Sequence, residues 1–229
     1  MAAAALFDWD GTLLDSRDAI LTAWHASSEA RIGRRFPASA AEDELVFTRP
    51  GLELFSALSD GDPADTAAFV AAFQEAYADS GRAVRAFDGV AEMLVALRAA
   101  GVAIGVVTSK ARRRLNADVG HAGLDGLIDA AICVEDVAFH KPDPAPVLAA
   151  LMALSAAPAD AAMAGDTPVD IAAGRAAGTA AALGVAWGAS GPGPLQAAGA
   201  AAVASDAAAL TEMILAAVCH HEPRKVSAP

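Results

Sequence analysis

The sequence predicts an α/β fold, in which a parallel sheet with helices on both faces carries an all-helical insertion. One short apolar run at residues 5–7 precedes a long stretch, 16–85, in which no strand pattern occurs. From residue 86 onward, apolar strand-like runs alternate with helical segments, as in repeated βα units. We therefore expect residues 1–15 and 86–229 to form one core and residues 16–85 to form an inserted helical domain.

The predictions for the insertion and for the core both depend on the periodicity of apolar residues and on residues typical of helix ends. In the insertion, apolar residues recur at helical spacing, and Asp62-Pro63 is typical of a helix start. Helices are expected there over 17–31, 42–47 and 52–58 and from residue 63. In the core, strands are expected at 102–107, 131–134, 161–164, 179–185 and 203–204. Helices are expected between them at 90–100, 111–119, 145–155, 168–177 and 210–218.

Composition excludes several classes of function. The chain has 229 residues and a net charge of −12, which argues against a nucleic-acid ligand because phosphate backbones require a basic face. No run of large apolar residues is long enough for a membrane helix, and the first residues lack the basic start of a signal peptide. Cys133 and Cys219 have no motif spacing and suit a reducing compartment, with Cys133 buried in a strand-like run. The expected location is the cytoplasm.

Two carboxylates follow the first strand. Asp8 and Asp10 are separated by one residue, so they can converge on one small volume where the chain leaves the sheet. Close acids repel each other, and a divalent cation or a shared proton relieves the repulsion. Gly11 permits a tight turn and Thr12 supplies a hydroxyl. An ordinary Asp-Gly turn is the alternative interpretation.

The later strand ends decide between these interpretations. Thr108 and Ser109 follow the second strand, Asp166 follows the strand at 161–164, and Asp170 comes one helical turn later. Lys141 begins a helix between them. Because the carboxyl ends of parallel strands meet at one edge of a sheet, these groups are expected at a common site.

Phosphoryl transfer fits this set of groups. Asp8 can attack phosphorus, while Asp10 protonates the leaving alcohol and then activates water. Mg²⁺ suits an all-oxygen site formed by Asp8, the carbonyl of Asp10 and Asp166. The reaction also requires groups that hold the phosphoryl group and offset its negative charge. We expect Thr108 and Ser109 to hold it and Lys141 to offset the charge.

Several of these residues also have ordinary structural roles. Thr108 and Ser109 could cap the next helix, and Asp170 could be an early-helix acid favoured by the dipole. Asp143 is interpreted as a helix cap. A run of basic residues follows the second strand, and we interpret it as a solvated face rather than a binding patch. Its members are Lys110, Arg112, Arg113 and Arg114.

Four segments resemble, in order, the motifs of the haloacid dehalogenase-like hydrolase superfamily: FDWDGTL at 7–13, VTSK at 107–110, KPDP at 141–144 and GDTPVD at 165–170. The resemblance implies a Rossmann-like core, a C1-type helical cap, Mg²⁺ and an aspartyl-phosphate intermediate. The nearest pattern is that of phosphoglycolate phosphatase-like members. By motif match Asp8 is the nucleophile, Asp10 the acid/base, Thr108 the phosphate binder and Lys141 the charge stabiliser. Asp166 is a metal ligand, and Asp170 is a metal-site acid. Gly11, Thr12 and Ser109 are assigned to phosphate binding.

The family contains several reactions. Asp10 disfavours dehalogenation, because dehalogenases lack this second acid. Residues 16–85 contain no lysine, which disfavours phosphonatase chemistry. A β-phosphoglucomutase-type mutase and a pyrophosphatase remain open, and a phospho-accepting receiver domain is the alternative from another class. Trp9 departs from the smaller aliphatic residue that is common at its position, and its side chain is expected to point away from the site.

The insertion is expected to select the substrate, a small phosphorylated metabolite. Arg49 is the candidate for binding an anionic group of that substrate, with Arg34 and Arg35 as weaker candidates. The chain is expected to act as a monomer or homodimer, without a nucleic acid or membrane partner.

Overall fold

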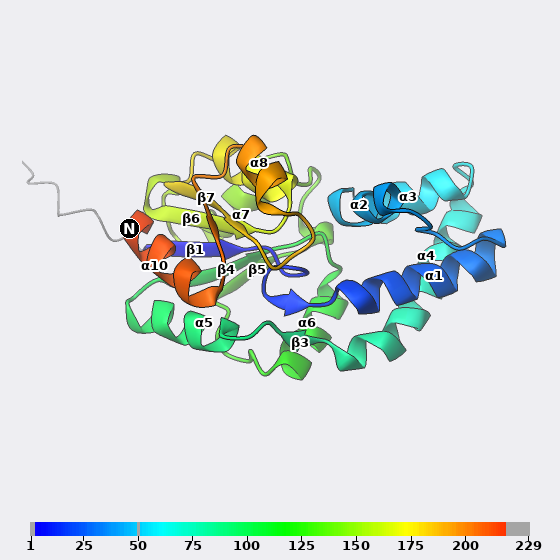
Figure 1. Cartoon of the computed structure of the whole chain (residues 1–229), viewed down its shortest axis with the longest axis horizontal. Coiled ribbons are helices and arrows are strands. Elements are labelled where there is room, and N and C mark those ends of the chain that lie inside the picture. Colours follow the sequence, from blue (N-terminus) through cyan, green and yellow to red (C-terminus); the bar gives the residue numbers. More distant parts are fainter. Residues whose placement is uncertain (1–2, 50, 219–229) are drawn as a thin grey trace, which may run out of the picture.

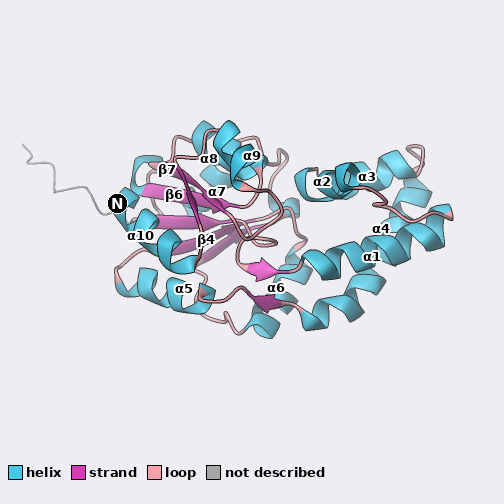
Figure 2. Ribbon diagram, viewed as in Figure 1, coloured by secondary structure: helices cyan, strands magenta, loops and turns pink. Residues whose placement is uncertain are grey.

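The computed structural model describes residues 3–49 and 51–218, and its centre is a six-stranded sheet with the order β5-β4-β1-β6-β7-β8 (Figures 1 and 2). Every neighbouring pair in this sheet is parallel. The strands are β1 (Ala4–Phe7), β4 (Ala103–Val107), β5 (Ala130–Ile132), β6 (Ala161–Gly165), β7 (Ala181–Val185) and β8 (Ala202–Ala204). Since β1 lies between β4 and β6, the strand order reverses beside β1, where such sheets bind ligands.

Helices cover both faces of the sheet, which confirms the predicted fold class. One face packs against α5 (Val90–Ala99), α6 (Arg112–Ala122) and α10 (Ala207–Val218) in a hydrophobic cluster that contains Phe7 and Ile104. The other face packs Leu6 and Met163 against α7 (Ala145–Ala153) and α8 (Pro168–Ala176). The short helix α9 (Pro192–Ala197) contributes Leu195 to a smaller cluster with Ile171 of α8.

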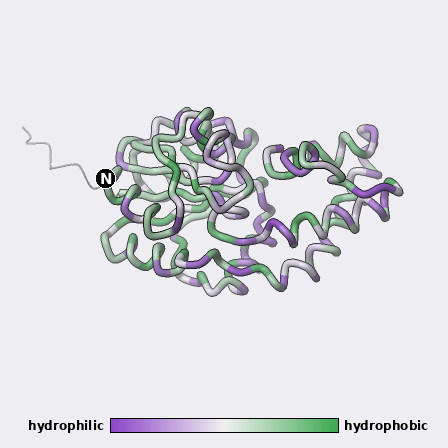
Figure 3. The backbone as a smooth tube through the Cα atoms, viewed as in Figure 1, coloured by the Kyte–Doolittle hydropathy of each residue, from purple (hydrophilic) through white to green (hydrophobic). Residues whose placement is uncertain are grey.

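The strands are apolar along their whole length because both of their faces are covered. All four residues of β1 are fully buried. Such continuous apolar runs are typical of parallel strands with helices on both sides. Figure 3 shows the resulting contrast, with helices that alternate between hydrophobic and hydrophilic residues around a largely hydrophobic sheet.

The α-helices of the inserted segment extend away from the sheet (Figure 1). They are α1 (Arg17–Ile32), α2 (Ala40–Thr48), α3 (Gly51–Leu58) and α4 (Pro63–Ser80). Asp62 accepts hydrogen bonds from the backbone N–H groups of Ala64 and Asp65, which confirms the predicted start of α4. An aromatic cluster holds the helices together, and in it the rings of Trp24 and Phe55 stack 4.2 Å apart. This separate core explains how the insertion holds its shape away from the sheet.

A two-stranded antiparallel ladder joins the insertion to the sheet. β2 (Leu14–Asp15) pairs with β3 (Arg85–Ala86) at the two ends of the inserted segment. The prediction that residues 16–85 contain no strand is therefore wrong at Arg85. A two-residue strand has no periodicity to detect. This one forms only because it pairs with a segment that lies 70 residues away in the sequence. The ladder lies at the residues where the division of the chain was predicted, 15/16 and 85/86, and the division into two domains stays a prediction.

Smaller differences concern the end of β5. The predicted strand at 131–134 ends at Ile132 instead, because a 3₁₀ turn over Val134–Asp136 follows and the Asp136 carboxylate accepts a hydrogen bond from the Cys133 N–H. Cys133 is buried, as predicted, whereas Cys219 lies outside the described residues. Among the helices of residues 3–49 and 51–218, none has the length and apolarity needed to cross a membrane.

Candidate active site

A cavity of about 1200 Å³ separates the carboxyl edge of the sheet from the helical insertion. Its floor holds Asp8, Thr108 and Asp166, which follow β1, β4 and β6. The insertion contributes side chains from α1 to α4 to the opposite wall. The prediction that the strand ends meet at one site agrees with this geometry.

Lys141 is the central cation of the floor. Its Nζ donates hydrogen bonds to Asp8 Oδ1 at 2.8 Å, to Asp170 Oδ1 at 2.6 Å and to the carbonyl of Val107 at 2.9 Å. Only 5% of its side chain is exposed. Burial alone would lower the pKa of Lys141, but the charges of Asp170 and Asp8 raise it above its ordinary value. The ammonium group is therefore charged and lies directly beside Asp8.

Asp166 is held rigidly at the end of β6. Thr12 Oγ1 donates to Asp166 Oδ1 at 3.1 Å, and the Ala189 N–H donates to Asp166 Oδ2 at 2.7 Å. Two glycines make this packing possible. A Cβ atom at Gly11, which has a φ of 82°, would lie 2.2 Å from Asp166 Oδ2, and one at Gly188 would lie 2.2 Å from Asp166 Cβ. Nothing in the sequence indicates that the loop at 188–189 belongs to the site, because its contribution is a backbone N–H group and the absence of a Cβ atom.

Asp170 is an early-helix acid, which is the ordinary structural role considered for it, and it also contacts Lys141. It is fully buried in the first turn of α8, where Thr167 donates to Asp170 Oδ2 through its backbone N–H at 3.1 Å and its hydroxyl at 2.6 Å. The other oxygen accepts the Lys141 hydrogen bond. Asp170 thus stabilises the start of the helix and fixes the position of Lys141.

Three acids lie close together at the floor of the cavity, where Asp166 and Asp170 are buried and Asp8 is partly buried. Asp8, Asp166 and Asp170 each have a carboxylate oxygen within 4.8 Å of the others. Burial, followed by the Asp170 charge, raises the pKa of Asp166 to about 7. Burial also raises the pKa of Asp8 well above its ordinary value, against the opposing charge of Lys141. A set of oxygen ligands with excess negative charge fits a hard divalent cation such as Mg²⁺.

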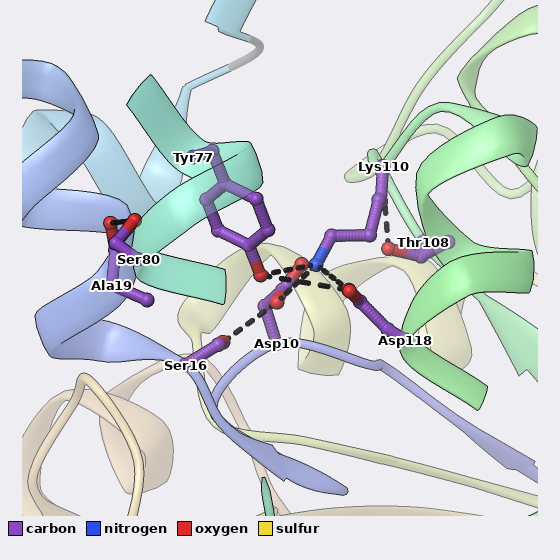
Figure 4. Close-up of polar contacts among 8 residues, drawn as sticks. All are labelled: Asp10, Ser16, Ala19, Tyr77, Ser80, Thr108, Lys110 and Asp118. Atoms are coloured by element: carbon purple, nitrogen blue, oxygen red, sulfur yellow. Dashed lines mark hydrogen bonds and ion pairs between the residues drawn. The ribbon is translucent and has the colours of Figure 1, made fainter. Parts of the chain in front are cut away.

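Asp10 lies in a different environment from Asp8. Its Oδ1 accepts hydrogen bonds from Ser16 Oγ at 2.6 Å and from Lys110 Nζ at 2.8 Å (Figure 4). Ser16 precedes α1, but its side chain makes no hydrogen bond that caps this helix. Trp9, between the two acids, is fully buried in the hydrophobic core, in agreement with its predicted orientation.

The interpretation of Lys110 as part of a solvated face is wrong. Only 7% of its side chain is exposed, and it also contacts Tyr77 of α4 and Asp118 of α6. Burial would lower the pKa of Lys110, but the charges around it raise it, and burial raises the pKa of Tyr77 to about 12. The position of Lys110, directly after Thr108-Ser109 at a strand end, was the signal that could have identified it. The other basic residues differ: Arg112 pairs with Asp136, Arg113 is exposed and lines the cavity, and Arg114 lies over the Tyr77 ring.

Thr108 and Ser109 do not cap α6. The helix begins at Arg112, and Thr108 Oγ1 accepts a hydrogen bond from the Lys110 N–H at 3.1 Å. Both residues line the cavity, where Thr108 is buried and Ser109 is exposed. Asp143 Oδ1 accepts from the Ala145 N–H at 2.8 Å, but Pro144 holds the N-cap position of α7, so Asp143 lies one residue before the cap that was predicted for it.

The candidate arginines of the insertion occupy different places. Arg49 is exposed and lines the cavity. Arg34 pairs with Glu42 and Arg35 contacts His25, and neither lines the cavity formed by the described residues. Arg49 is therefore the arginine of the three that can reach a bound substrate.

Comparison with known proteins decides the family. The model of the haloacid dehalogenase-like hydrolase family matches residues 5–183. The chain belongs to this family. This hydrolase is 35% identical over 185 residues to the pyrophosphatase PpaX of Bacillus velezensis, a match that covers 80% of this chain and 83% of the relative.

Solved structures show the same fold for this haloacid dehalogenase-like hydrolase. A hydrolase from Pseudomonas syringae superposes with a TM-score of 0.81 at 24% identity, over 92% of this chain and 96% of the other. A protein described as a predicted phosphoglycolate phosphatase from Haemophilus somnus superposes with a TM-score of 0.77 at 21% identity, over 93% and 97% of the two chains. Family membership makes the chain an enzyme, which contradicts the receiver-domain alternative.

Proposed function

We propose that this enzyme is a Mg²⁺-dependent phosphatase that hydrolyses a small phosphomonoester through an aspartyl-phosphate on Asp8. The separate environments of the two acids carry this proposal. Asp8 lies beside the Lys141 ammonium among buried carboxylates, whereas Asp10 is held by Ser16 and Lys110. Two carboxylates in different environments can serve as nucleophile and as acid/base in one reaction.

The reaction follows from this division of roles. An oxygen of Asp8 attacks phosphorus, the bond from phosphorus to the ester oxygen breaks, and Asp10 gives its proton to the departing oxygen. Water then attacks the phosphorus of the intermediate. Asp10 takes a proton from this water, the bond from phosphorus to Asp8 breaks, and inorganic phosphate leaves. Both carboxyl groups return to their starting states.

The floor of the cavity would hold the transferring phosphoryl group. Thr108 and Ser109 line this cavity after the end of β4. Gly11 and Thr12 are not among the described residues that line the cavity, and the fully buried Thr12 donates its hydroxyl to Asp166 instead. Lys141 offsets the charge that Asp8 and the phosphoryl group bring together. We assign phosphate binding to Thr108, Ser109 and Lys141, and not to Gly11 and Thr12 as the sequence suggested.

Mg²⁺ fits the acidic group beside the nucleophile. Asp8, Asp166 and the backbone carbonyl of Asp10 would hold it, with Asp170 as the further acid of the site. When bound, the ion supplies positive charge to the phosphoryl oxygens. In this arrangement, Thr12 and the Ala189 N–H orient Asp166.

Mg²⁺ is expected to stabilise the protein more at pH 8 than at pH 5. Because the folded-state pKa of Asp166 is raised from 3.8 to about 7, its contribution to stability is present at low pH and is lost as the pH rises toward 7. Mg²⁺ relieves this loss at pH 8, whereas at pH 5 it must displace a proton. At ~100 times its dissociation constant, Mg²⁺ should raise the free energy of unfolding at pH 8 by about 2.7 kcal/mol, or Tm by about 5–10 °C.

Thermal melts with and without Mg²⁺ test this expectation without reference to turnover. Asp166→Asn should remove the Mg²⁺-dependent shift, and Asp18→Asn, at an exposed acid in the first turn of α1, should retain it. Equal shifts at the two pH values would contradict the assignment of the metal site.

The substrate is proposed to resemble phosphoglycolate, and pyrophosphate is the second candidate because the PpaX relatives are pyrophosphatases. A phosphate-release screen over phosphoglycolate, pyrophosphate and sugar phosphates separates them, and β-glucose 1-phosphate tests mutase activity by its product. Phosphate release that depends on Mg²⁺ from at least one monoester is the expected result. Failure of every monoester, with pyrophosphate turned over, would replace the first candidate by the second.

Arg49→Ala is expected to raise KM for phosphoglycolate about 10-fold and to leave kcat nearly unchanged, because Arg49 would bind the carboxylate away from the reacting phosphorus. With p-nitrophenyl phosphate, which has no carboxylate, KM should not change. Arg82→Ala is the matched control, since Arg82 is exposed on the insertion and lies outside the residues that line the cavity. An equal rise in KM for both substrates would exclude the proposed role of Arg49.

A further inference from the structure

The ammonium group of Lys110 joins three parts of the fold. Its Nζ donates to Asp10 Oδ1 after β1 at 2.8 Å, to Tyr77 Oη on α4 at 3.1 Å and to Asp118 Oδ2 on α6 at 2.5 Å. Figure 4 shows these acceptors converging on Nζ from separate ribbons. The Lys110 and Asp118 side chains are only 7% and 3% exposed, so solvent screens their contacts little.

These contacts use the full donor capacity of the lysine. An ammonium group has three N–H donors, and Lys110 has three acceptors. Lys110 therefore has no donor left for a substrate phosphate while this arrangement persists. The role of Lys110 must therefore come from the groups that it already binds, which are Asp10, Tyr77 and Asp118.

The contacts of Lys110 restrict one carboxylate of the reaction. Lys110 and Ser16 both donate to the same oxygen, Asp10 Oδ1. Two donors on one oxygen fix the rotation of the carboxylate, and the second oxygen is the one available for proton transfer. Asp118 and Tyr77 in turn fix the lysine, since each accepts one of its hydrogen bonds.

We propose that Lys110, held by Asp118 and Tyr77, is a positioning residue that aims Asp10 at the leaving group. The proposal depends on the phosphatase function assigned above, in which Asp10 protonates the departing oxygen. Tyr77 belongs to the insertion, so one of the groups that set the geometry of the acid comes from outside the sheet domain. The alignment of the acid is thus linked to the position of α4.

Two substrates of similar shape test the proposal. Phenyl phosphate depends on protonation of its leaving group more than p-nitrophenyl phosphate does, because phenolate is the stronger base. The measurement is kcat/KM, which reports the steps up to release of the leaving group. Lys110→Met should lower kcat/KM about 100-fold for phenyl phosphate and less than about 10-fold for p-nitrophenyl phosphate. Tyr77→Phe, which removes only a hydroxyl, should change the ratio in the same direction by about 3-fold.

Ser80→Ala is the matched control. Ser80 lies one turn after Tyr77 on α4 and donates to the carbonyls of Ala19 and Ala76, without contact to Asp10 or Lys110 (Figure 4). Its removal should leave the ratio of the two kcat/KM values unchanged. If the loss of Lys110 destabilises the fold by stranding the buried Asp118 charge, the double variant Lys110→Met/Asp118→Asn removes that charge. The same selective loss is expected from it.

The outcomes separate this proposal from the function on which it depends. Equal losses for both substrates in Lys110→Met or in the double variant would overturn the positioning role, because general loss of structure affects both alike. A wild-type chain that releases phosphate from neither aryl ester nor any monoester of the screen would instead overturn the phosphatase assignment.

Discussion

Replacement of Asp8 by asparagine is expected to lower kcat by about 10⁴-fold or more, without loss of thermal stability. An amide cannot form the acyl-phosphate, so every substrate should be affected. Asp8 is partly buried, and this burial raises its pKa well above the ordinary value, so the folded protein loses little when a neutral side chain replaces this carboxylate. The introduced asparagine side chain would retain an oxygen that can accept the Lys141 hydrogen bond.

The measurements are phosphate release, thermal unfolding and mass spectrometry of acid-quenched enzyme. A phosphate adduct on Asp8 is expected in the wild-type chain and not in the variant. Asp15→Asn, at an exposed acid of β2 in the same stretch of sequence, should retain full activity. Turnover by Asp8→Asn at the wild-type rate would show that another group attacks phosphorus.

Lys141→Met is expected to lower both stability and activity. Its loss leaves Asp8 and Asp170 without the cation between them, and 13% and 0% of these side chains are exposed. Removal of one partner from a buried ion pair costs about 3–5 kcal/mol of unfolding free energy. For a chain of this length that corresponds to a decrease in Tm of about 6–20 °C. We expect kcat to decrease about 10²–10³-fold, as when a donor to the transition state is removed.

A double variant separates the charge effect from the loss of side-chain packing. Lys141→Met/Asp170→Asn removes one charge of each sign, so it should be more stable than Lys141→Met alone, although equally impaired in turnover. Arg98→Met is the surface control: Arg98 and Asp129 are 2.5 Å apart, but their side chains are 37% and 34% exposed. Such a pair contributes at most about 1 kcal/mol. If Lys141→Met were no more destabilising than this control, the buried pair would not be a stabilising element.

Much of the site could be predicted because its residues follow strands. Asp8, Thr108 and Asp166 each come directly after an apolar run, and parallel strands bring their carboxyl ends to one edge. The sequence pattern and this rule together locate the floor of the cavity. The family resemblance then assigned individual roles, which the proposed experiments test.

The contacts around Asp10 could not be predicted in the same way. Tyr77 and Asp118 are 41 residues apart, and they meet because side chains in the last turns of α4 reach α6, where Arg114 also contacts the Gln74 carbonyl and the Tyr77 ring. Helical periodicity shows which face of a helix is apolar, but it does not show which polar side chain near a helix end reaches a neighbouring element. Lys110 was therefore assigned to solvent on the basis of the basic run that follows it.

The sequence by itself determined the alternation of strands and helices, the long helical insertion and the acids, hydroxyl and lysine at the strand ends. These features are local: each depends on apolar periodicity, on a turn or on a residue type at a strand end. Only the tertiary structure decided that Asp170 fixes Lys141, that the 188–189 loop holds Asp166, and that Lys110 is buried beside Asp10. These contacts join segments far apart in the chain, and their geometry is set by how whole elements pack against one another.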